Sequence, residues 1–201
     1  MKSIPILLTL VVSHQLVSAQ EKLSREEALY YARAVAPHAT QVQGLPVATE
    51  VDLTRPVAMR EEDYGGLVLP QKGLTVETLA AAGETPVPVG QLWFHRLAPV
   101  RHGEAVPRSA LRMVTVRTQG DEATVPQCTL AVRRTAAGAL ELLVYGKAKE
   151  PLLQVPLRSV ETPASEPIDL AAVREGDFGR LTLKLLGRYQ ATLSVTELAD
   201  W

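Results

Sequence analysis

The most distinctive chemistry-bearing segment of the chain is residues 86–97, where a tryptophan, a histidine and an arginine lie close together. On an extended strand Trp93 and His95 share one face, and Arg96 lies on the other. Tryptophan and arginine commonly anchor binding interfaces, so the segment is a candidate binding face on which Trp93 stacks against a ligand while His95 and Arg96 grip a polar or anionic group. The favoured interpretation is nevertheless a core tryptophan beneath a helix, with His95 and Arg96 reaching water at the strand end.

A second candidate is a short motif that occurs twice, at residues 60–69 and 174–183. Each copy has an acidic turn, an aromatic residue, a glycine and an alternating strand; the acidic turn residues are Glu61, Glu62, Asp63 and Asp177. Aspartate can hydrogen-bond the backbone of a turn, and glycine tolerates a positive φ. The repeat predicts two equivalent strand entries in a pseudo-symmetric fold, and the alternative is a pair of ligand- or cation-binding loops.

Recognised catalytic and metal-binding motifs are absent from the sequence. The four histidines have neither the helical i, i+4 nor the strand i, i+2 spacing that aims two imidazoles at one ion. The single cysteine, Cys128, excludes a disulfide framework and a multi-thiolate site, and its alternating segment predicts a buried thiol. No Gly-x-Ser-x-Gly elbow or Ser-x-x-Lys motif is present. We therefore expect no metal and no cofactor.

The beginning of the chain predicts export. Lys2 precedes an apolar run over residues 4–12, and Val17 and Ala19 place small residues at the usual positions before a cleavage site. Residues 1–19 are thus predicted to be a signal peptide, which places the protein in the periplasm or outside the cell, with no membrane span after removal of the signal. The formal net charge of −1 argues against nucleic acid as a partner.

The elements that must position these residues are mostly strands. Short alternating runs rich in Val, Leu and Thr are separated by Gly and Pro, and the candidate strands are residues 47–53, 67–69, 91–97, 111–118, 125–135, 139–146, 180–186 and 189–196. Gly138 suits a three-residue hairpin loop, and Gly187-Arg188 suits a type II′ turn. This spacing predicts a mainly β fold, an antiparallel β-sandwich or partly open barrel.

One N-terminal amphipathic helix is predicted to pack on this domain. Ser24 and Glu27 form a capping box, and Pro37 ends the helix. Two short helical turns are also predicted, at residues 76–82 and 170–175. The predicted organisation is a helix and linker over residues 20–43, followed by a single β-rich domain over residues 44–201.

These features favour an exported, non-enzymatic binding or structural module with an unknown protein or glycan ligand. The alternative is an exported hydrolase whose carboxylates and histidines come together from distant strands. It predicts a pocket that holds at least two of the following residues: Glu61, Glu62, Asp63, His95, His102 and Asp177. The oligomeric state does not follow from the sequence.

Overall fold

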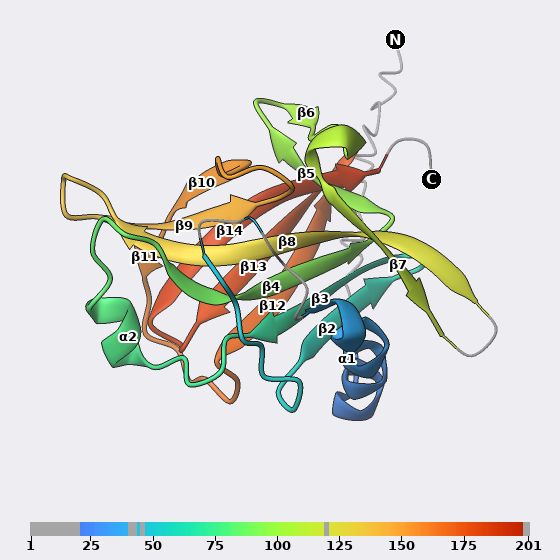
Figure 1. The fold of residues 1–201 in the computed structure, drawn as a ribbon, viewed down its shortest axis with the longest axis horizontal. Coiled ribbons are helices and arrows are strands. Elements are labelled where there is room, and N and C mark those ends of the chain that lie inside the picture. The colour runs from blue at the N-terminus through green and yellow to red at the C-terminus, as the bar shows by residue number, and fades with distance from the viewer. Residues whose placement is uncertain (1–20, 40–43, 45–46, 119–120, 199–201) are drawn as a thin grey trace, which may run out of the picture.

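The fold is an antiparallel β-sandwich, as the strand pattern predicts. The computed structural model describes residues 21–39, 44, 47–118 and 121–198, and its strands form two sheets packed face to face (Figure 1). Strands of alternating polarity bury one face each, and two such sheets cover each other's apolar faces.

The larger sheet has eight strands in the order β1-β2-β3-β4-β8-β9-β10, and β7 also pairs with β8. Its members are β1 (Glu21–Lys22), β2 (Val57–Glu61), β3 (Tyr64–Pro70), β4 (Val87–His95), β7 (Arg112–Arg117), β8 (Glu122–Arg134), β9 (Leu140–Tyr145) and β10 (Leu153–Pro156).

The smaller sheet has six strands in the order β12-β13-β14-β5-β6, and β11 also pairs with β14. Its members are β5 (Leu97–Arg101), β6 (Glu104–Ala105), β11 (Arg158–Ser159), β12 (Ile168–Glu175), β13 (Phe178–Leu185) and β14 (Tyr189–Glu197). A 3₁₀ turn, η1 (Arg108–Ala110), precedes β7.

The main core lies between the two sheets. Leu181, Leu183 and Leu185 of β13 are at most 4% exposed, and Ala191, Leu193 and Val195 of β14 are at most 3% exposed, so the predicted inward faces of this hairpin are confirmed. Each fully buried aliphatic side chain contributes about 1.5–3 kcal/mol of burial free energy. Cys128 is fully buried in this core, which confirms the expected buried thiol.

The N-terminal helix α1 (Arg25–Ala39) covers the outer face of the larger sheet (Figure 1). Its capping box forms as predicted, because the backbone N–H of Ser24 donates to Glu27 and the backbone N–H of Glu27 donates to the Ser24 hydroxyl. The predicted end at Pro37 is wrong, since the helix continues to Ala39. There the buried Gln91 amide donates to the Ala39 carbonyl, which satisfies an acceptor in the last turn and holds the helix to β4.

Both predicted hairpins form, but one uses a different turn. Gly138 has a φ of 85° in the three-residue loop between β8 and β9, as expected. Between β13 and β14 the positive φ values fall on Leu186 and Gly187, and the N–H of Arg188 donates to the Leu185 carbonyl. The turn therefore centres on Leu186-Gly187 rather than on Gly187-Arg188.

Three further predictions need correction. Residues 170–175 are not helical but belong to edge strand β12, because Leu170 and Ala172 pack into the sandwich at a period of two. Residues 47–53 form only an isolated bridge between Val51 and Gln71, and the strand in this region begins after Pro56. The run over 91–97 is broken at Arg96, whose φ of 56° turns the chain from β4 into β5 of the opposite sheet.

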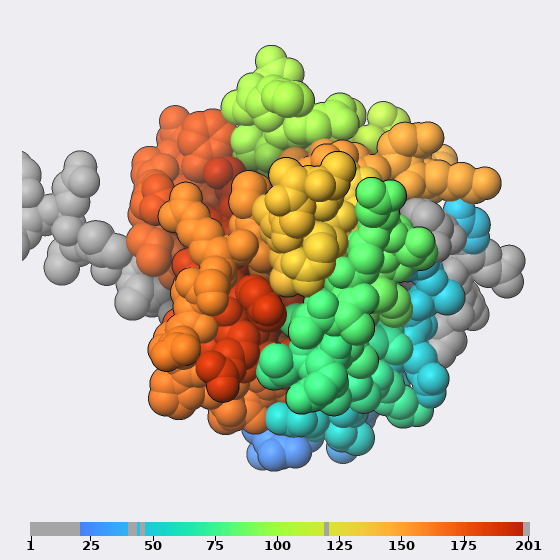
Figure 2. Space-filling view, turned by 90° about the vertical axis from the view of Figure 1, so that its left-hand side faces the viewer, coloured from blue at the N-terminus to red at the C-terminus, as the bar shows by residue number. Residues whose placement is uncertain are grey.

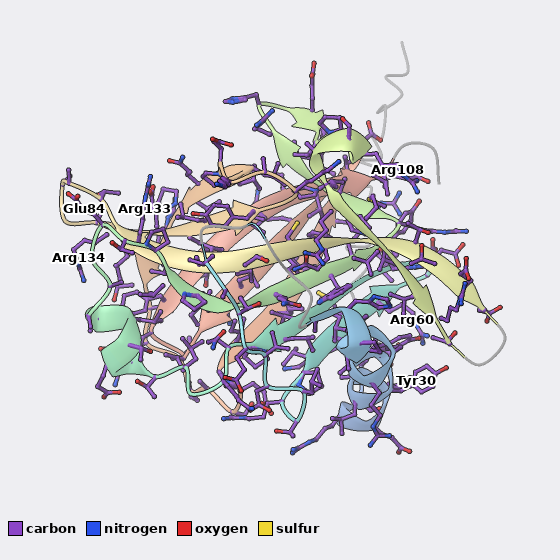
Figure 3. The ribbon with its side chains drawn as sticks, viewed as in Figure 1. Tyr30, Arg60, Glu84, Arg108, Arg133 and Arg134 are labelled. Carbon is purple, nitrogen blue, oxygen red and sulfur yellow. The ribbon has the colours of Figure 1, made fainter. Side chains whose placement is uncertain are left out.

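One end of the sandwich is closed by the short helix α2 (Val76–Ala80), which Thr75 caps as expected. Arg134 at the end of β8 donates to the carbonyls of Ala80, Ala82 and Gly138, and so joins α2 to the β8–β9 hairpin (Figure 3). Figure 2 looks onto this end, where α2, the hairpin and the segment before β12 cover the strands.

The predicted signal peptide, residues 1–19, lies outside the described residues. The division at residue 44 into a helical segment and a β-rich domain stays a prediction. Among the residues that the structure describes, no helix has the length and apolar character needed to cross a membrane.

Candidate functional site

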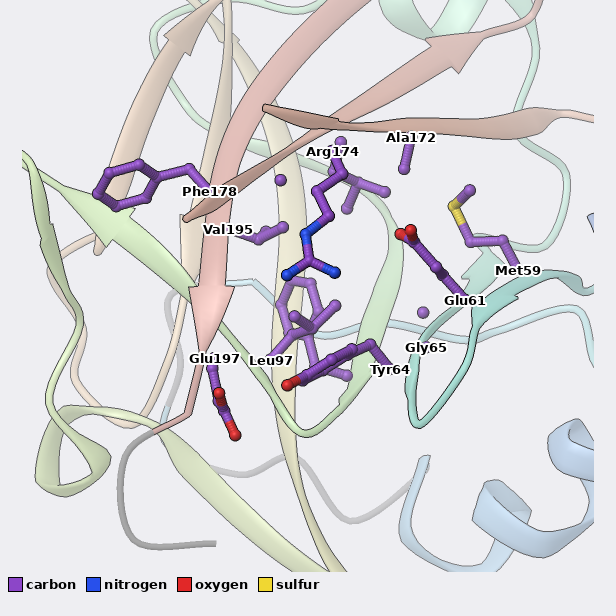
Figure 4. A pocket seen from close by; sticks show the side chains of 14 residues that line it. Met59, Glu61, Tyr64, Gly65, Leu97, Ala172, Arg174, Phe178, Val195 and Glu197 are labelled. Atoms are coloured by element: carbon purple, nitrogen blue, oxygen red, sulfur yellow. The ribbon is translucent and has the colours of Figure 1, made fainter. Parts of the chain in front are cut away.

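A pocket opens between the two sheets at the end of the sandwich opposite α2 (Figure 4). Strand β4 runs from the α2 end to this one, where it finishes at His95. The pocket has a volume of about 90 Å³, enough for several waters or part of a small ring. Its lining residues are Met59, Glu61, Tyr64, Gly65, Gly66, Phe94, Leu97, Ala172, Arg174, Phe178, Gly179, Leu181, Val195 and Glu197.

The two copies of the repeated motif form the two hairpins that border this pocket. In the β2–β3 hairpin Glu61 pairs with Tyr64, and in the β12–β13 hairpin Glu175 pairs with Phe178, so the two registers correspond residue by residue. The first turn residue has a positive φ in both, 51° at Glu62 and 62° at Gly176. The repeat thus encodes the same two-residue turn at the same end of both sheets.

The hairpins are nevertheless not related by a simple pseudo-symmetry, because they turn opposite faces to the core. Leu67 of the first copy packs in the cluster beneath α1, whereas the equivalent Leu181 packs between the sheets. The expectation of two equivalent entries in a pseudo-symmetric fold is therefore correct for the turns and wrong for the faces. As a consequence Glu61 enters the pocket from one sheet and Arg174 enters it from the other (Figure 4).

Arg96 fixes the hairpin of the larger sheet beside the chain crossover. Its guanidinium Nη1 lies 2.9 Å from a carboxylate oxygen of Asp63, and its backbone carbonyl accepts from the N–H of Leu198. The side chain of Arg96 thus binds the β2–β3 turn, and its backbone binds the segment after β14. The next residue, Leu97, is part of the pocket wall. On the other hairpin the Thr196 hydroxyl donates to the Asp177 carbonyl.

The rim of the pocket combines aromatic and charged side chains above an apolar floor. Partial burial, and then a hydrogen bond to the Glu197 carboxylate, raises the pKa of Tyr64, so its phenol stays protonated and donates. Phe178 is 42% exposed, and its ring points away from the pocket (Figure 4), because Leu181 and Leu183 occupy the inward positions of β13 and Phe178 lies at an alternate, outward position. Arg174 extends between these elements from β12 (Figure 4).

His95 lies close to this site but outside the lining. It pairs with Gly65 at the end of β4, and the loss of hydration together with the charge of Arg96 lowers the pKa of its imidazole. The neutral imidazole is therefore favoured near pH 7, and His95 does not present a permanent positive charge to a ligand.

Trp93 is a core residue and not part of the exposed rim. It is 2% exposed and belongs to the cluster that contains Ala28, Ala32 and Val35 of α1. This confirms the favoured interpretation given above, a tryptophan beneath a helix, and a buried indole offers no open face on which a ligand could stack.

The structure brings most of the predicted site residues to one end of the sandwich. His95, Arg96, Asp63 and Asp177 surround the pocket, but of the residues proposed for a hydrolytic site only Glu61 lines it. The sequence did not predict the places of Tyr64, Arg174 and Glu197 in the pocket. Tyr64 and Arg174 lie within the repeated motif, which was the available signal, and nothing in the sequence pointed to Glu197.

Comparison with known proteins adds no relative. No protein-family model matches the chain, and no curated protein and no solved structure matches it significantly. Among the described residues no group of three His, Cys, Asp or Glu side chains is placed to hold a metal ion. A functional assignment for this chain therefore depends on the chemistry of the pocket.

Proposed function

We propose that this protein is an exported, non-enzymatic β-sandwich module that binds a ligand in the pocket between its two repeated hairpins. The observation that carries the proposal is the convergence of both copies of the motif on one concave site. An apolar floor with a few convergent polar groups is the usual composition of a ligand pocket. The site of action would be the periplasm or the cell exterior, as the N-terminal segment predicts.

The hairpin framework suits binding because it holds the rim in place without a ligand. The β2–β3 turn is tied to the chain crossover by Arg96 and Asp63, and the β12–β13 hairpin carries a bond between Arg180 and Glu175. A rim that is already ordered loses little conformational entropy when a ligand binds. Tyr64 supplies an aromatic side chain in the pocket that a ligand can contact (Figure 4).

The test is to screen the mature chain against an array of glycans and an array of unmodified peptides. We expect binding to one array that is lost in Tyr64→Ala, which removes an aromatic side chain from the pocket (Figure 4), and retained in Tyr30→Ala. Tyr30 is the matched control because it is 45% exposed on α1 and points away from the sheets (Figure 3). Equal binding by both variants, or no binding by the parent chain to either array, would refute the pocket as the ligand site.

Export is tested separately by expression of the full chain with its natural N-terminus. We expect the exported form to begin at Gln20, which intact-mass measurement detects directly. An exported or retained protein that still carries residues 1–19 would contradict this part of the proposal.

A hydrolase is the second candidate, because two carboxylates from distant strands, Glu61 and Glu197, both line the pocket. Paired carboxylates flank the scissile bond in most glycoside hydrolases. The assay is release of nitrophenol from a panel of nitrophenyl glycosides and esters. Turnover that disappears in both Glu61→Gln and Glu197→Gln, but persists in Glu122→Gln on the remote β7–β8 hairpin, would favour this candidate over the binding module.

A further inference from the structure

We infer that the ligand of the pocket is an extended peptide, which adds as a further strand to the edge of β12 and places one aliphatic side chain in the pocket. This inference rests on the proposed function, since it names the ligand class for the same pocket. Two independent features carry it. One is the half of the β12 edge that no described strand pairs, and the other is the apolar wall of the pocket beside that half.

The register of the β12–β13 hairpin determines which backbone groups of β12 lie at the edge. Strand β12 is last in the strand order of the smaller sheet, and among the described residues it pairs with β13 alone. The N–H of Leu186 donates to the carbonyl of Pro167, which identifies this position as a hydrogen-bonded pair. Such pairs alternate with non-hydrogen-bonded pairs along an antiparallel ladder, so residues 169, 171, 173 and 175 turn their backbone groups to β13. Residues 168, 170, 172 and 174 turn theirs outward.

The first half of this edge is protected and the second half is open. The outward N–H of Leu170 donates to the carboxylate of Asp169, and Lys22 of β1 pairs with the same carboxylate. Charged groups of this kind keep a sheet edge from pairing with another chain. Beyond Leu170 the strand has no proline and no bulge, and in the described part of the chain no hydrogen bond from another element reaches the outward backbone groups of Ala172 and Arg174. These two residues can therefore pair with an added strand.

A strand added here would direct alternate side chains toward the pocket. Side chains that lie directly opposite each other in an antiparallel pair are on the same face of the sheet. Ala172 lines the pocket from β12, and Met59 and Glu61 line it from β2 of the other sheet (Figure 4). A peptide residue opposite Ala172 therefore points its side chain between the two sheets, at the mouth of the pocket. Its neighbours along the peptide lie on the outer face, beside Val173, which is 40% exposed.

The walls and size of the pocket favour an aliphatic side chain. Phe94 and Leu181, each at most 4% exposed, close its floor. Gly66 occupies an inward position of β3, two residues before the buried Val68, and a Cβ added there would meet only the Met59 Cγ, at 4.0 Å. The space that a side chain on β3 would fill is therefore available to a ligand. A volume of about 90 Å³, about that of three waters in the liquid, has room for one branched aliphatic group.

A second copy of this chain does not suit the same place. The side chains that another β12 would direct inward include Ile168 and Leu170, which are at most 4% exposed because they are packed in the core of their own sandwich. Two-fold pairing about Ala172 would also set Asp169 of one copy opposite Glu175 of the other, and like charges opposite each other are destabilising. The occupant is therefore a segment of a different polypeptide whose alternate side chains are free.

The experiment measures fluorescence anisotropy with labelled heptapeptides of alternating serine and threonine that carry Leu, Val, Phe, Ser or Asp at the central position. We expect the Leu or Val peptide to bind at least about tenfold more tightly than the Ser peptide, because its side chain leaves water for the pocket. Gly66→Val fills the pocket and should reduce the Leu peptide to the affinity of the Ser peptide. Tyr30→Ala, the matched control, should bind like the parent chain, and melting curves of the variants identify any loss of folding.

A second pair of peptides tests the strand pairing. N-methylation of the central residue removes the N–H that would bond Ala172 and should weaken binding at least about tenfold, whereas methylation of the next residue, whose N–H points away from β12, should change it little. The variant Ala172→Pro removes the outward N–H on the protein side without loss of a bond to β13, and it should weaken the Leu peptide as well.

The outcomes separate this inference from the proposed function. Preference for Phe, Ser or Asp, or an unchanged affinity of the Leu peptide in Gly66→Val, would overturn the assignment of an aliphatic side chain to the pocket. Equal effects of the two methylations would overturn the pairing with β12. If no heptapeptide binds but a glycan binds in the array screen and is lost in Tyr64→Ala, the peptide inference fails and the proposed function stands. If neither class of ligand binds, both fail.

Discussion

Replacement of Trp93 distinguishes a core role from a binding role more sharply than any other single change. The side chain is 2% exposed and packs with the apolar residues of α1 against the larger sheet. Two substitutions are informative, Trp93→Ala, which removes the ring system, and Trp93→Phe, which keeps an aromatic ring in the same place.

The expected losses follow from burial. A buried tryptophan removes about 150–250 Å² from water, worth about 4–6 kcal/mol at 25 cal/mol per Å², and measured losses for Trp→Ala in cores are about 3–5 kcal/mol. Trp93→Ala should therefore lower the free energy of unfolding by about 3–5 kcal/mol. Trp93→Phe removes less volume and should cost about 1–2 kcal/mol, and the exposed Tyr30→Ala should change it by less than about 0.5 kcal/mol.

The assay is urea denaturation followed by circular dichroism, together with ligand binding by the folded Trp93→Phe variant. We expect its ligand affinity to equal that of the parent chain, because the indole lies beneath α1 and not at the pocket. A variant that keeps its stability but loses ligand binding would refute the assignment of Trp93 to the core and restore a role for the strand face it shares with His95.

Three further results are expected. Burial raises the pKa of the Cys128 thiol to about 12. A thiol reagent at pH 8 should therefore label the native protein only as fast as the protein transiently unfolds, whereas it should label the denatured protein at once. Rapid labelling of the native protein would contradict the burial of Cys128. The lowered pKa of His95 means that the unfolded state binds its proton more readily, so the free energy of unfolding should fall as pH drops below about 6.5, and His95→Gln should flatten that slope. Gly187→Ala should lower the melting temperature markedly, because φ is 66° at this residue and the added Cβ would lie 2.2 Å from the Thr162 carbonyl oxygen. Gly138→Ala should lower the melting temperature less, because the Cβ added there meets no neighbouring atom.

The strands that could be predicted are those whose neighbours in sequence are also their neighbours in space. The β13–β14 hairpin follows from alternating leucines and a glycine, and its partner strand is the next one in the chain. The segment after Asp169 falsely predicts a helix, because an aspartate and a glycine at its two ends resemble helix caps. Its apolar face is set by contact with the opposite sheet, which local sequence does not reveal.

The candidate site could be predicted only in outline. The repeated motif correctly indicated two like turns, and it contains Tyr64 and Arg174. Which of its residues face inward depends on how each hairpin sits on the core, and the two copies differ in this respect. Glu197 reaches the pocket because β14 pairs with β5 after the crossover at Arg96, a long-range pairing with no local signature.

The proposed function depends most on the pocket at the hairpin end being the place where a ligand binds. The direct measurement is the amide spectrum of the ¹⁵N-labelled protein during titration with the glycan or peptide that binds in the array screen. We expect the amides of Gly65, Gly66 and Gly179, which lie in the pocket wall, to shift in a saturable way, while Gly138 at the opposite end stays unchanged. Saturable shifts that cluster around Gly138, on α1 or on any other surface would contradict the account.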